Sequence, residues 1–177
     1  TINGIGSDPF STFAVTRLLG AKGRDQTMPP PILGANPEEL LSLAEFSSDS
    51  QEKMVRALAD TFWPGAMTLV VKSAIQPGWD MSAVGGSVAL RVPLCDEALA
   101  VLNVTGPLAV TSANRTGMPP ARSVAEAKEY FGSEVAVYVD GGPADGQAPS
   151  TIVDCTGEEP RVIRIGDIPV LRVQEVL

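Results

Sequence analysis

The feature that most constrains this chain is the alternation of helical segments with short apolar runs, separated by glycine and proline. Helical spacing of apolar residues predicts helices near residues 10–19, 36–46, 50–62, 96–102 and 123–131. Short β-like runs cover residues 67–71, 88–92, 108–111, 135–139, 151–153 and 161–165. Interleaved helices and strands are typical of an α/β fold. We therefore expect one α/β domain over residues 1–177, with a twisted mixed β-sheet flanked by helices and a strand order that the pattern leaves open.

Local signals place several helix ends. Asn36 suits an N-cap, Pro37 the first helical position, and Glu39 the acidic position of a capping box. Ser123 begins a second capping-box pattern. Pro64 ends the helix expected over residues 50–62. These boundaries divide the chain into short units that suit a compact sheet.

Composition adds limits on environment. Hydrophobic residues make up 44% and charged residues 19% of the 177-residue chain, as in globular proteins, and no apolar run approaches the roughly 18 residues of a membrane span. Cys95 and Cys155 form no CxxC motif, so a reduced, cytoplasmic protein is expected. The chain begins at Thr1 without methionine, and we expect upstream sequence, including an N-terminal strand, to be missing.

The chain contains no histidine, and this excludes a whole set of mechanisms. A Ser-His-Asp triad, a Cys-His pair and a histidine-ligated metal all require that residue. Catalysis must then depend on carboxylates, Lys or Arg, hydroxyls, backbone amides, or a metal that the substrate carries. The net charge of −8 also argues against broad binding of a phosphate backbone.

Two polar segments are candidates for chemistry. Lys22-Gly23-Arg24 places two cations at a helix exit, where they could hold phosphates, although cations that complement a helix dipole are the favoured interpretation on spacing alone. Ser112-Ala113-Asn114 follows an apolar strand, where a small polar ligand and an ordinary turn are equally good interpretations.

A third candidate is Arg91, which lies inside an apolar strand. It either extends to water at a sheet edge or faces a cavity and pairs with an anion, and the second interpretation is slightly favoured. Ser150 and Arg164 also flank short strands, but each alone is a weak signal.

Taken in order, these segments resemble the YrdC-like family, the threonylcarbamoyl-AMP synthases. The resemblance depends on the stretches at residues 1–6, 21–24, 63–69, 89–93, 112–117, 140–142, 150–154 and 162–166. They extend over nearly the whole chain in the family's order. The resemblance therefore implies a YrdC-like fold.

The resemblance also implies a reaction in which L-threonine, bicarbonate and ATP give threonylcarbamoyl-AMP and pyrophosphate, for the t6A modification of tRNA. By similarity, the threonine-binding residues are Thr1, Arg91, Ser112 and Ser150. Those that bind ATP are Arg24, Ser87, Asn114 and Arg164, with Lys22 adding charge at the phosphates and Lys22 and Arg24 as the catalytic candidates. Mg²⁺ would enter with ATP, and no protein-ligated metal is expected. Other t6A-pathway proteins or tRNA would be transient partners, and a membrane would not.

Two alternatives remain open. The first is a non-catalytic RNA-binding member of the same fold, against which the charge of −8 argues. The second is a paralogue that makes a different carbamoyl-adenylate. Asn3 and Leu33 favour it, because the family has tyrosine and histidine at these positions.

Overall fold

The computed structural model describes residues 2–23, 28–143 and 148–177, and its described part contains one mixed β-sheet of eight strands. The strands are β1 (Gly4–Ser7), β2 (Ile32–Leu33), β3 (Ala44–Glu45), β4 (Met67–Ser73), β5 (Ser87–Arg91), β6 (Leu108–Ser112), β7 (Thr151–Asp154) and β8 (Arg161–Arg164). Their spatial order is β1-β6-β2-β5-β4-β7-β8, and β3 pairs with β4 outside this path. The pairs β2–β5 and β4–β7 are parallel, and the other pairs are antiparallel.

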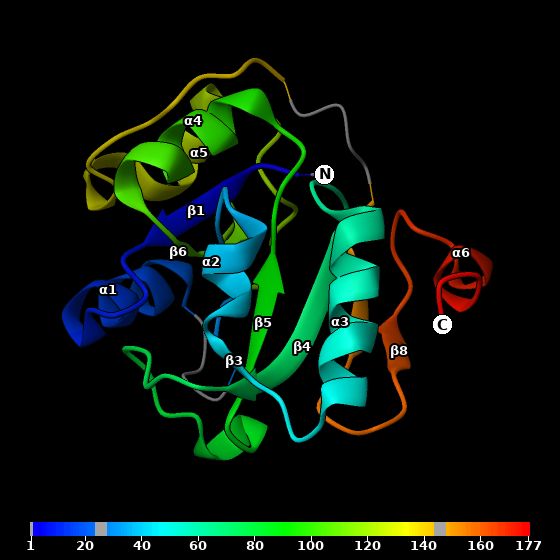
Figure 1. The fold of residues 1–177 in the computed structure, drawn as a ribbon. Coiled ribbons are helices and arrows are strands. Elements are labelled where there is room, and N and C mark those ends of the chain that lie inside the picture. The colour runs from blue at the N-terminus through cyan, green and yellow to red at the C-terminus, as the bar shows by residue number, and fades with distance from the viewer. Residues whose placement is uncertain (1, 24–27, 144–147) are drawn as a thin grey trace.

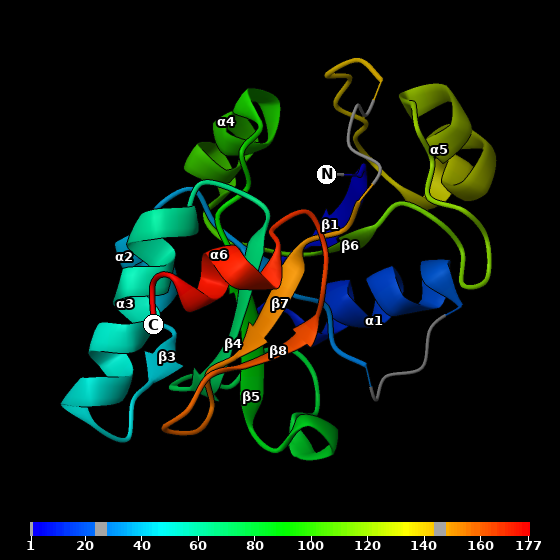
Figure 2. The same cartoon turned by 90° about the vertical axis from the view of Figure 1, so that its right-hand side faces the viewer.

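Helices flank this sheet on both sides (Figures 1 and 2). The α-helices are α1 (Thr12–Lys22), α2 (Pro37–Leu41), α3 (Asp49–Phe62), α4 (Asp96–Thr105), α5 (Val124–Phe131) and α6 (Val170–Gln174). Two 3-10 turns, η1 (Ser82–Val84) and η2 (Gly132–Glu134), complete the list. Helices α2 and α3 lie on one side of the sheet and α1 lies on the other (Figure 2). The sequence-based expectation of a mixed sheet flanked by helices is confirmed.

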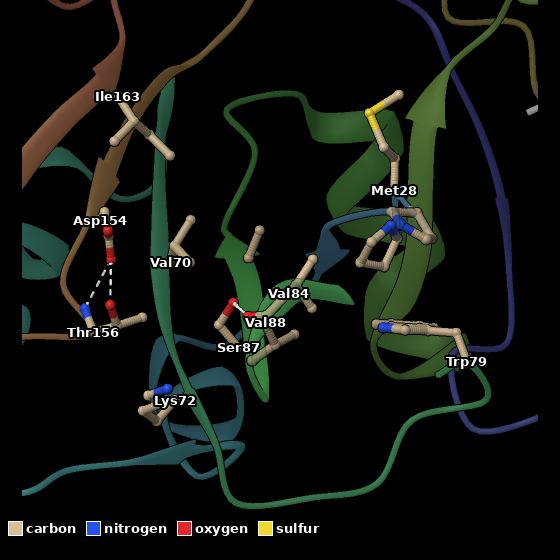
Figure 3. Close-up of a pocket in the computed structure, with 13 residues that line it drawn as sticks. Met28, Val70, Lys72, Trp79, Val84, Ser87, Val88, Asp154, Thr156 and Ile163 are labelled. Atoms are coloured by element: carbon tan, nitrogen blue, oxygen red, sulfur yellow. Dashed lines mark hydrogen bonds between the residues drawn. The ribbon is translucent and has the colours of Figure 1, made fainter. Parts of the chain in front are cut away.

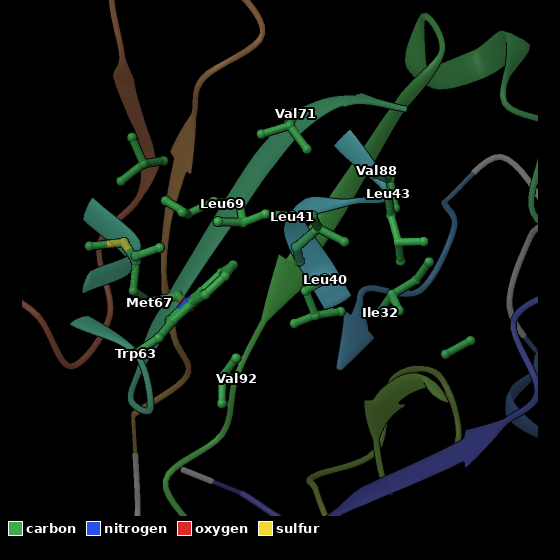
Figure 4. Close-up of a cluster of buried hydrophobic side chains, with 14 of the residues drawn as sticks. Ile32, Leu40, Leu41, Leu43, Trp63, Met67, Leu69, Val71, Val88 and Val92 are labelled. Carbon is green, nitrogen blue, oxygen red and sulfur yellow. The ribbon is translucent and has the colours of Figure 1, made fainter. Parts of the chain in front are cut away.

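The main hydrophobic core lies between α2, α3 and the face of β4 and β5 that they cover (Figure 4). Met67, Leu69 and Val71 of β4 are each at most 1% exposed and belong to this core. Successive residues of a strand point to opposite faces. The alternate positions Thr68 and Lys72 must therefore face away from α2 and α3. This alternation decides where polar groups gather.

Capping explains most of the helix ends. The Asn36 side chain accepts hydrogen bonds from the amides of Glu38 and Glu39, as its sequence context predicts. Gly23, with φ of 62°, caps the C-terminus of α1 in the left-handed conformation, which glycine adopts without a steric cost. Helix α1 therefore extends to Lys22 rather than ending near Gly20.

Two other expectations from the sequence are wrong. The helix expected over residues 36–46 ends at Leu41, because the chain turns there and residues 44–45 pair with β4 as β3. Residues 135–139 form no strand, because no described strand pairs with them. The two edge strands of the described sheet are β1 and β8. The pattern also missed the short helix α6.

None of the helices in the described part of the chain combines the length and apolarity that a membrane span requires.

Candidate active site

One face of the central strands forms a polar trough opposite the helices α2 and α3. Strand alternation places Ser87, Ala89 and Arg91 of β5 on this face, because Val88 and Leu90 are buried in the core. The same rule applies to Thr68 on the neighbouring strand β4 and to Ile152 on β7, which pair with each other in register. Three adjacent strands thus provide the floor of one site.

A cavity of about 530 Å³ occupies the end of this trough nearest Arg91. Four of the residues chosen from the sequence line it together, namely Arg91, Ser112, Ser150 and Arg164. They come from β5, the end of β6, the segment before β7, and the end of β8. Asn3 and Leu33 also line it. The fold therefore brings together residues that are far apart in the chain, as a binding site requires.

The two arginines give the cavity a positive potential. Arg91 donates from Nε to the Gly65 carbonyl at 2.7 Å, which fixes its side chain against the sheet. Burial lowers the pKa of Arg91, and the charge of Arg164 lowers that pKa further, whereas Asp167 raises it. Two cations that repel each other across a cavity favour an anionic ligand between them, since it neutralises both.

Arg164 and Ser150 are linked directly. Arg164 donates from Nε and Nη2 to the Ser150 carbonyl at 3.0 and 2.8 Å, and from Nη2 to Ser150 Oγ at 2.9 Å. Ser150 Oγ also lies 2.7 Å from Thr68 Oγ1. Both hydroxyls and the guanidinium are thus held in a fixed arrangement before any ligand binds.

Thr151, the next residue along, holds the turn that carries Arg164. Its fully buried hydroxyl donates to the Ile168 carbonyl and accepts from the amides of Gly166 and Ile168. We expect Thr151→Val to lower the free energy of unfolding by about 1–3 kcal/mol, because buried backbone groups lose their partner. Urea denaturation measures this, and Thr61→Val is the matched control, since the Thr61 hydroxyl only donates to a carbonyl within its own helix. Equal midpoints for the two variants would contradict the prediction.

Lys22 joins the two segments that the sequence first suggested. It is 3% exposed, and its Nζ donates to the carbonyls of Ser112 and Asn114 at 2.5 and 2.7 Å and to Asn114 Oδ1 at 3.3 Å. The Asn114 amide nitrogen in turn donates to the carbonyls of Arg115 and Met118. Lys22 and Asn114 therefore lie behind Ser112 and shape the loop, rather than lining the cavity.

A second cavity of about 430 Å³ continues the trough toward the other end of β5 (Figure 3). Pro29 and Ala89 line both cavities, so the two are neighbours on this face of the sheet. Ser87, expected from the sequence to bind ATP, lines this second cavity and donates to the Val84 carbonyl at 2.7 Å. The remaining two predicted residues, Thr1 and Arg24, lie outside the described residues.

The sequence analysis missed several residues of the trough. Thr68 and Ile152 lie within the family stretches 63–69 and 150–154 but were assigned no role with a ligand, and Trp79 lies in none of these stretches. A signal did exist for Thr68, since it alternates with the apolar residues Met67 and Leu69 in a buried strand. For Trp79 we find no comparable signal, because the loop that places it has no periodic pattern.

The described residues do not supply a protein-ligated metal site. Within ranges 2–23, 28–143 and 148–177, no three Cys, Asp or Glu side chains gather in a way that could hold a metal ion. The polar groups that line the cavity are mainly arginines and hydroxyls, which are poorer ligands for a hard cation than carboxylates are.

Comparison with known proteins places this arrangement in context. The model of the Sua5/YciO/YrdC family, described as "Telomere recombination", matches residues 1–166. The chain belongs to this family. The putative threonylcarbamoyl-AMP synthase of Mycobacterium tuberculosis is 44% identical over 177 residues, which cover all of this chain and 80% of that protein. The threonylcarbamoyl-AMP synthase of Pyrococcus abyssi is 33% identical over 181 residues.

Solved structures agree with the family assignment. P. abyssi Sua5 complexed with L-threonine matches this Sua5/YciO/YrdC chain with a TM-score of 0.89 at 30% identity. The match covers all of this chain and 51% of that one, so the chain spans about half the length of that relative. Escherichia coli YciO matches with a TM-score of 0.76 at 22% identity, which supports the fold alone. The YrdC-like fold expected from the sequence is confirmed.

Proposed function

We propose that this chain is an L-threonylcarbamoyladenylate synthase, a nucleotidyltransferase that forms threonylcarbamoyl-AMP and pyrophosphate from L-threonine, bicarbonate and ATP. The observation that carries the proposal is the convergence of Arg91 and Arg164 with serine hydroxyls in one cavity of about 530 Å³. Family membership and the L-threonine bound by the Sua5 relative support the same substrate.

The cavity suits an amino acid at one end. In this proposal the threonine carboxylate pairs with Arg91, while Ser112 and Ser150 offer hydroxyls to the polar groups of threonine. Thr1 would complete this subsite. Arg164, Ser87, Asn114 and Arg24 would bind ATP, with Asn114 acting through the loop that Lys22 holds.

The chemistry requires positioning more than a protein base. The neutral threonine amine forms a bond to the carbon of bicarbonate-derived CO₂, and the amine proton and the hydroxide lost by bicarbonate leave together as water, which gives a carbamate. A carbamate oxygen then attacks the α-phosphorus of ATP. A new oxygen–phosphorus bond forms as the bond from the α-phosphorus to the bridging oxygen breaks, and pyrophosphate leaves with that electron pair. In-line placement and neutralised charge supply most of the acceleration for such a step. Fixed arginines provide both without histidine.

Mg²⁺ would reach the site on the phosphates of ATP and would neutralise part of their charge. The described residues offer no carboxylate cluster for it, so we assign no protein ligand and no step to the ion. The product would serve t6A modification of tRNA in the cytoplasm. Transient contact with tRNA or with other t6A-pathway proteins is part of this proposal.

Threonine-dependent release of pyrophosphate tests the proposal. The 177-residue chain, given ATP, Mg²⁺ and bicarbonate, should release pyrophosphate only when L-threonine is added. Release that depends on another amino acid instead would favour the paralogue alternative, for which Asn3 and Leu33 in the cavity wall provide the reason. Salt-dependent RNA binding without turnover would favour the RNA-binding alternative.

Asn114→Ala should lower the turnover of the same reaction by about tenfold, an effect of about 1.4 kcal/mol. The reason is that its side chain makes three hydrogen bonds that shape the loop beside Ser112. Steady-state kinetics with Asn103→Ala, an exposed change on α4, is the matched control. A wild-type rate for Asn114→Ala would mean that the loop has no part in the reaction.

A further inference from the structure

The loop at residues 112–117 places Ser112 in the wall of the cavity. It leaves β6 and passes the C-terminal end of α1 before α5 begins (Figure 2). Arg115 belongs to this loop but lines neither of the two cavities on this face of the sheet. Any part that Arg115 has in the reaction must therefore act through the loop.

The guanidinium of Arg115 joins the loop to three other parts of the chain. Its Nε donates to the Tyr130 carbonyl at 2.9 Å, and its Nη1 donates to the Ala21 carbonyl at 2.8 Å. Its Nη2 donates to the Glu134 carboxylate, and its Cζ lies 5.8 Å from the centre of the Phe131 ring. The planar fork of donors in arginine allows one side chain to reach acceptors of α1, α5 and η2 at once.

The two carbonyls that Arg115 contacts are of a kind that needs a donor. Ala21 lies in the last turn of α1 and Tyr130 in the last turn of α5, where backbone carbonyls have no partner within the helix. The negative end of the helix dipole lies there too, so a cation is favourable. One arginine thus serves the ends of two helices, and Glu134 balances part of its charge.

The contacts between the loop and α1 run in both directions. From the loop, the Arg115 side chain and the Thr116 amide donate to the last two carbonyls of the helix. From the helix, Lys22 Nζ donates to the carbonyls of Ser112 and Asn114. A shift of Ser112 out of the cavity wall would therefore disturb hydrogen bonds from two charged groups, which are stronger than those between neutral groups.

We propose that Arg115 is a positioning residue for the reaction, which keeps Ser112 in place by fixing the loop to the ends of both α1 and α5. This inference rests on the proposed function, in which Ser112 binds threonine. The alternative is that Arg115 contributes to stability alone. The two differ measurably, because a contact that only stabilises the fold changes the melting temperature without changing the Michaelis constants of the folded protein.

The test compares Arg115→Met with Arg17→Met. Arg17 is the matched control, because it donates to the Glu134 carbonyl and lies over the ring of Phe13, contacts that leave the loop untouched. At a temperature where circular dichroism shows both variants folded, Arg115→Met should lower kcat/KM for threonine by about tenfold, mainly through a higher KM for threonine. Arg17→Met should keep the wild-type constants. Wild-type constants for a folded Arg115→Met variant would overturn the proposal.

Arg115→Lys is a milder change that tests the same role if Arg115→Met does not fold. Lysine keeps the positive charge near the helix ends, but its single ammonium group cannot reach the acceptors of both helices as the fork does. The KM for threonine should therefore still rise, by less than in Arg115→Met. A folded Arg115→Lys variant with the wild-type KM would show that joining both helices is unnecessary, and the proposal would fail.

A double-mutant cycle shows whether Arg115 acts through Ser112. In a Ser112→Ala background the hydroxyl that the loop presents is already absent. Arg115→Met should then lower kcat/KM for threonine by no more than about twofold further, because the two changes affect the same contact. A further loss of about tenfold would mean that Arg115 acts independently of Ser112, which contradicts the proposal.

Threonine-dependent release of pyrophosphate by the wild-type chain separates the two proposals. If this release is observed and Arg115→Met keeps the wild-type constants, only the positioning role is overturned. If the wild-type chain releases no pyrophosphate with threonine, the proposed function is overturned, and the positioning role with it.

Discussion

Lys22→Met is expected to lower kcat/KM for threonine by about 100-fold, an effect of about 2.8 kcal/mol. The buried ammonium group donates to three oxygens of the loop at Ser112 and Asn114. Hydrogen bonds from a charged group are stronger than those between neutral groups, and methionine keeps the length and apolar stem of lysine while it removes all of them. Without them, Ser112 is no longer held in the wall of the cavity.

The same variant distinguishes two roles for Lys22. If Lys22 positions the loop, the free energy of unfolding should fall by about 1–3 kcal/mol, since the Ser112 and Asn114 carbonyls lose their donor. Binding of threonine should weaken as well. If Lys22 instead contacts the phosphates, kcat should fall while stability and threonine affinity stay unchanged. Lys53→Met, an exposed change on α3, is the matched control. A Lys22→Met variant with wild-type kinetics would contradict both roles.

Arg91→Met is expected to lower kcat/KM for threonine by a larger factor, between about 100-fold and 1,000-fold, or about 3–4 kcal/mol. Loss of one partner of a buried charge pair typically costs this much, because the threonine carboxylate would remain in the cavity without its cation. Methionine again keeps the apolar contacts of the stem. The effect should appear mainly in KM for threonine, while KM for ATP changes little.

Steady-state kinetics over both substrates measures this separation. Arg172→Met is the matched control, since Arg172 lies far along the chain on α6 and pairs there with Glu175 at the surface. The two Michaelis constants carry the test: an increase in KM for ATP with no change in KM for threonine would assign Arg91 to the nucleotide and exchange the two ends of the proposed site.

Local signals in the sequence predicted the secondary structure correctly where its cause lies in neighbouring residues. Asn36 caps α2 because its side chain reaches the next free amides, and the proline at 64 ends the preceding helix wherever the rest of the chain lies. The signals failed at residues 42–46 and 135–139, where pairing with another strand, or its absence, decided the outcome. Strand pairing depends on distant residues, which local patterns do not contain.

The candidate site shows the same division. Family motifs located Arg91, Ser112, Ser150 and Arg164, and the structure brings these four together. The sequence allowed two roles for Lys22, contact with a phosphate or stabilisation of a helix dipole. Its hydrogen bonds to the loop at Ser112 and Asn114 are a third arrangement, which spacing did not suggest because about ninety residues separate the partners.

By itself, the sequence determined an α/β domain, a chemistry without histidine and the residue types of the site. It did so because helix caps, strand alternation and composition act over short stretches of chain. Only the tertiary structure decided that β5 and β7 flank β4, that the two cavities are neighbours on one face of the sheet and that Lys22 holds the loop at Ser112. These features depend on how distant segments pack, and packing places a side chain in a core or in a cavity irrespective of its neighbours in sequence.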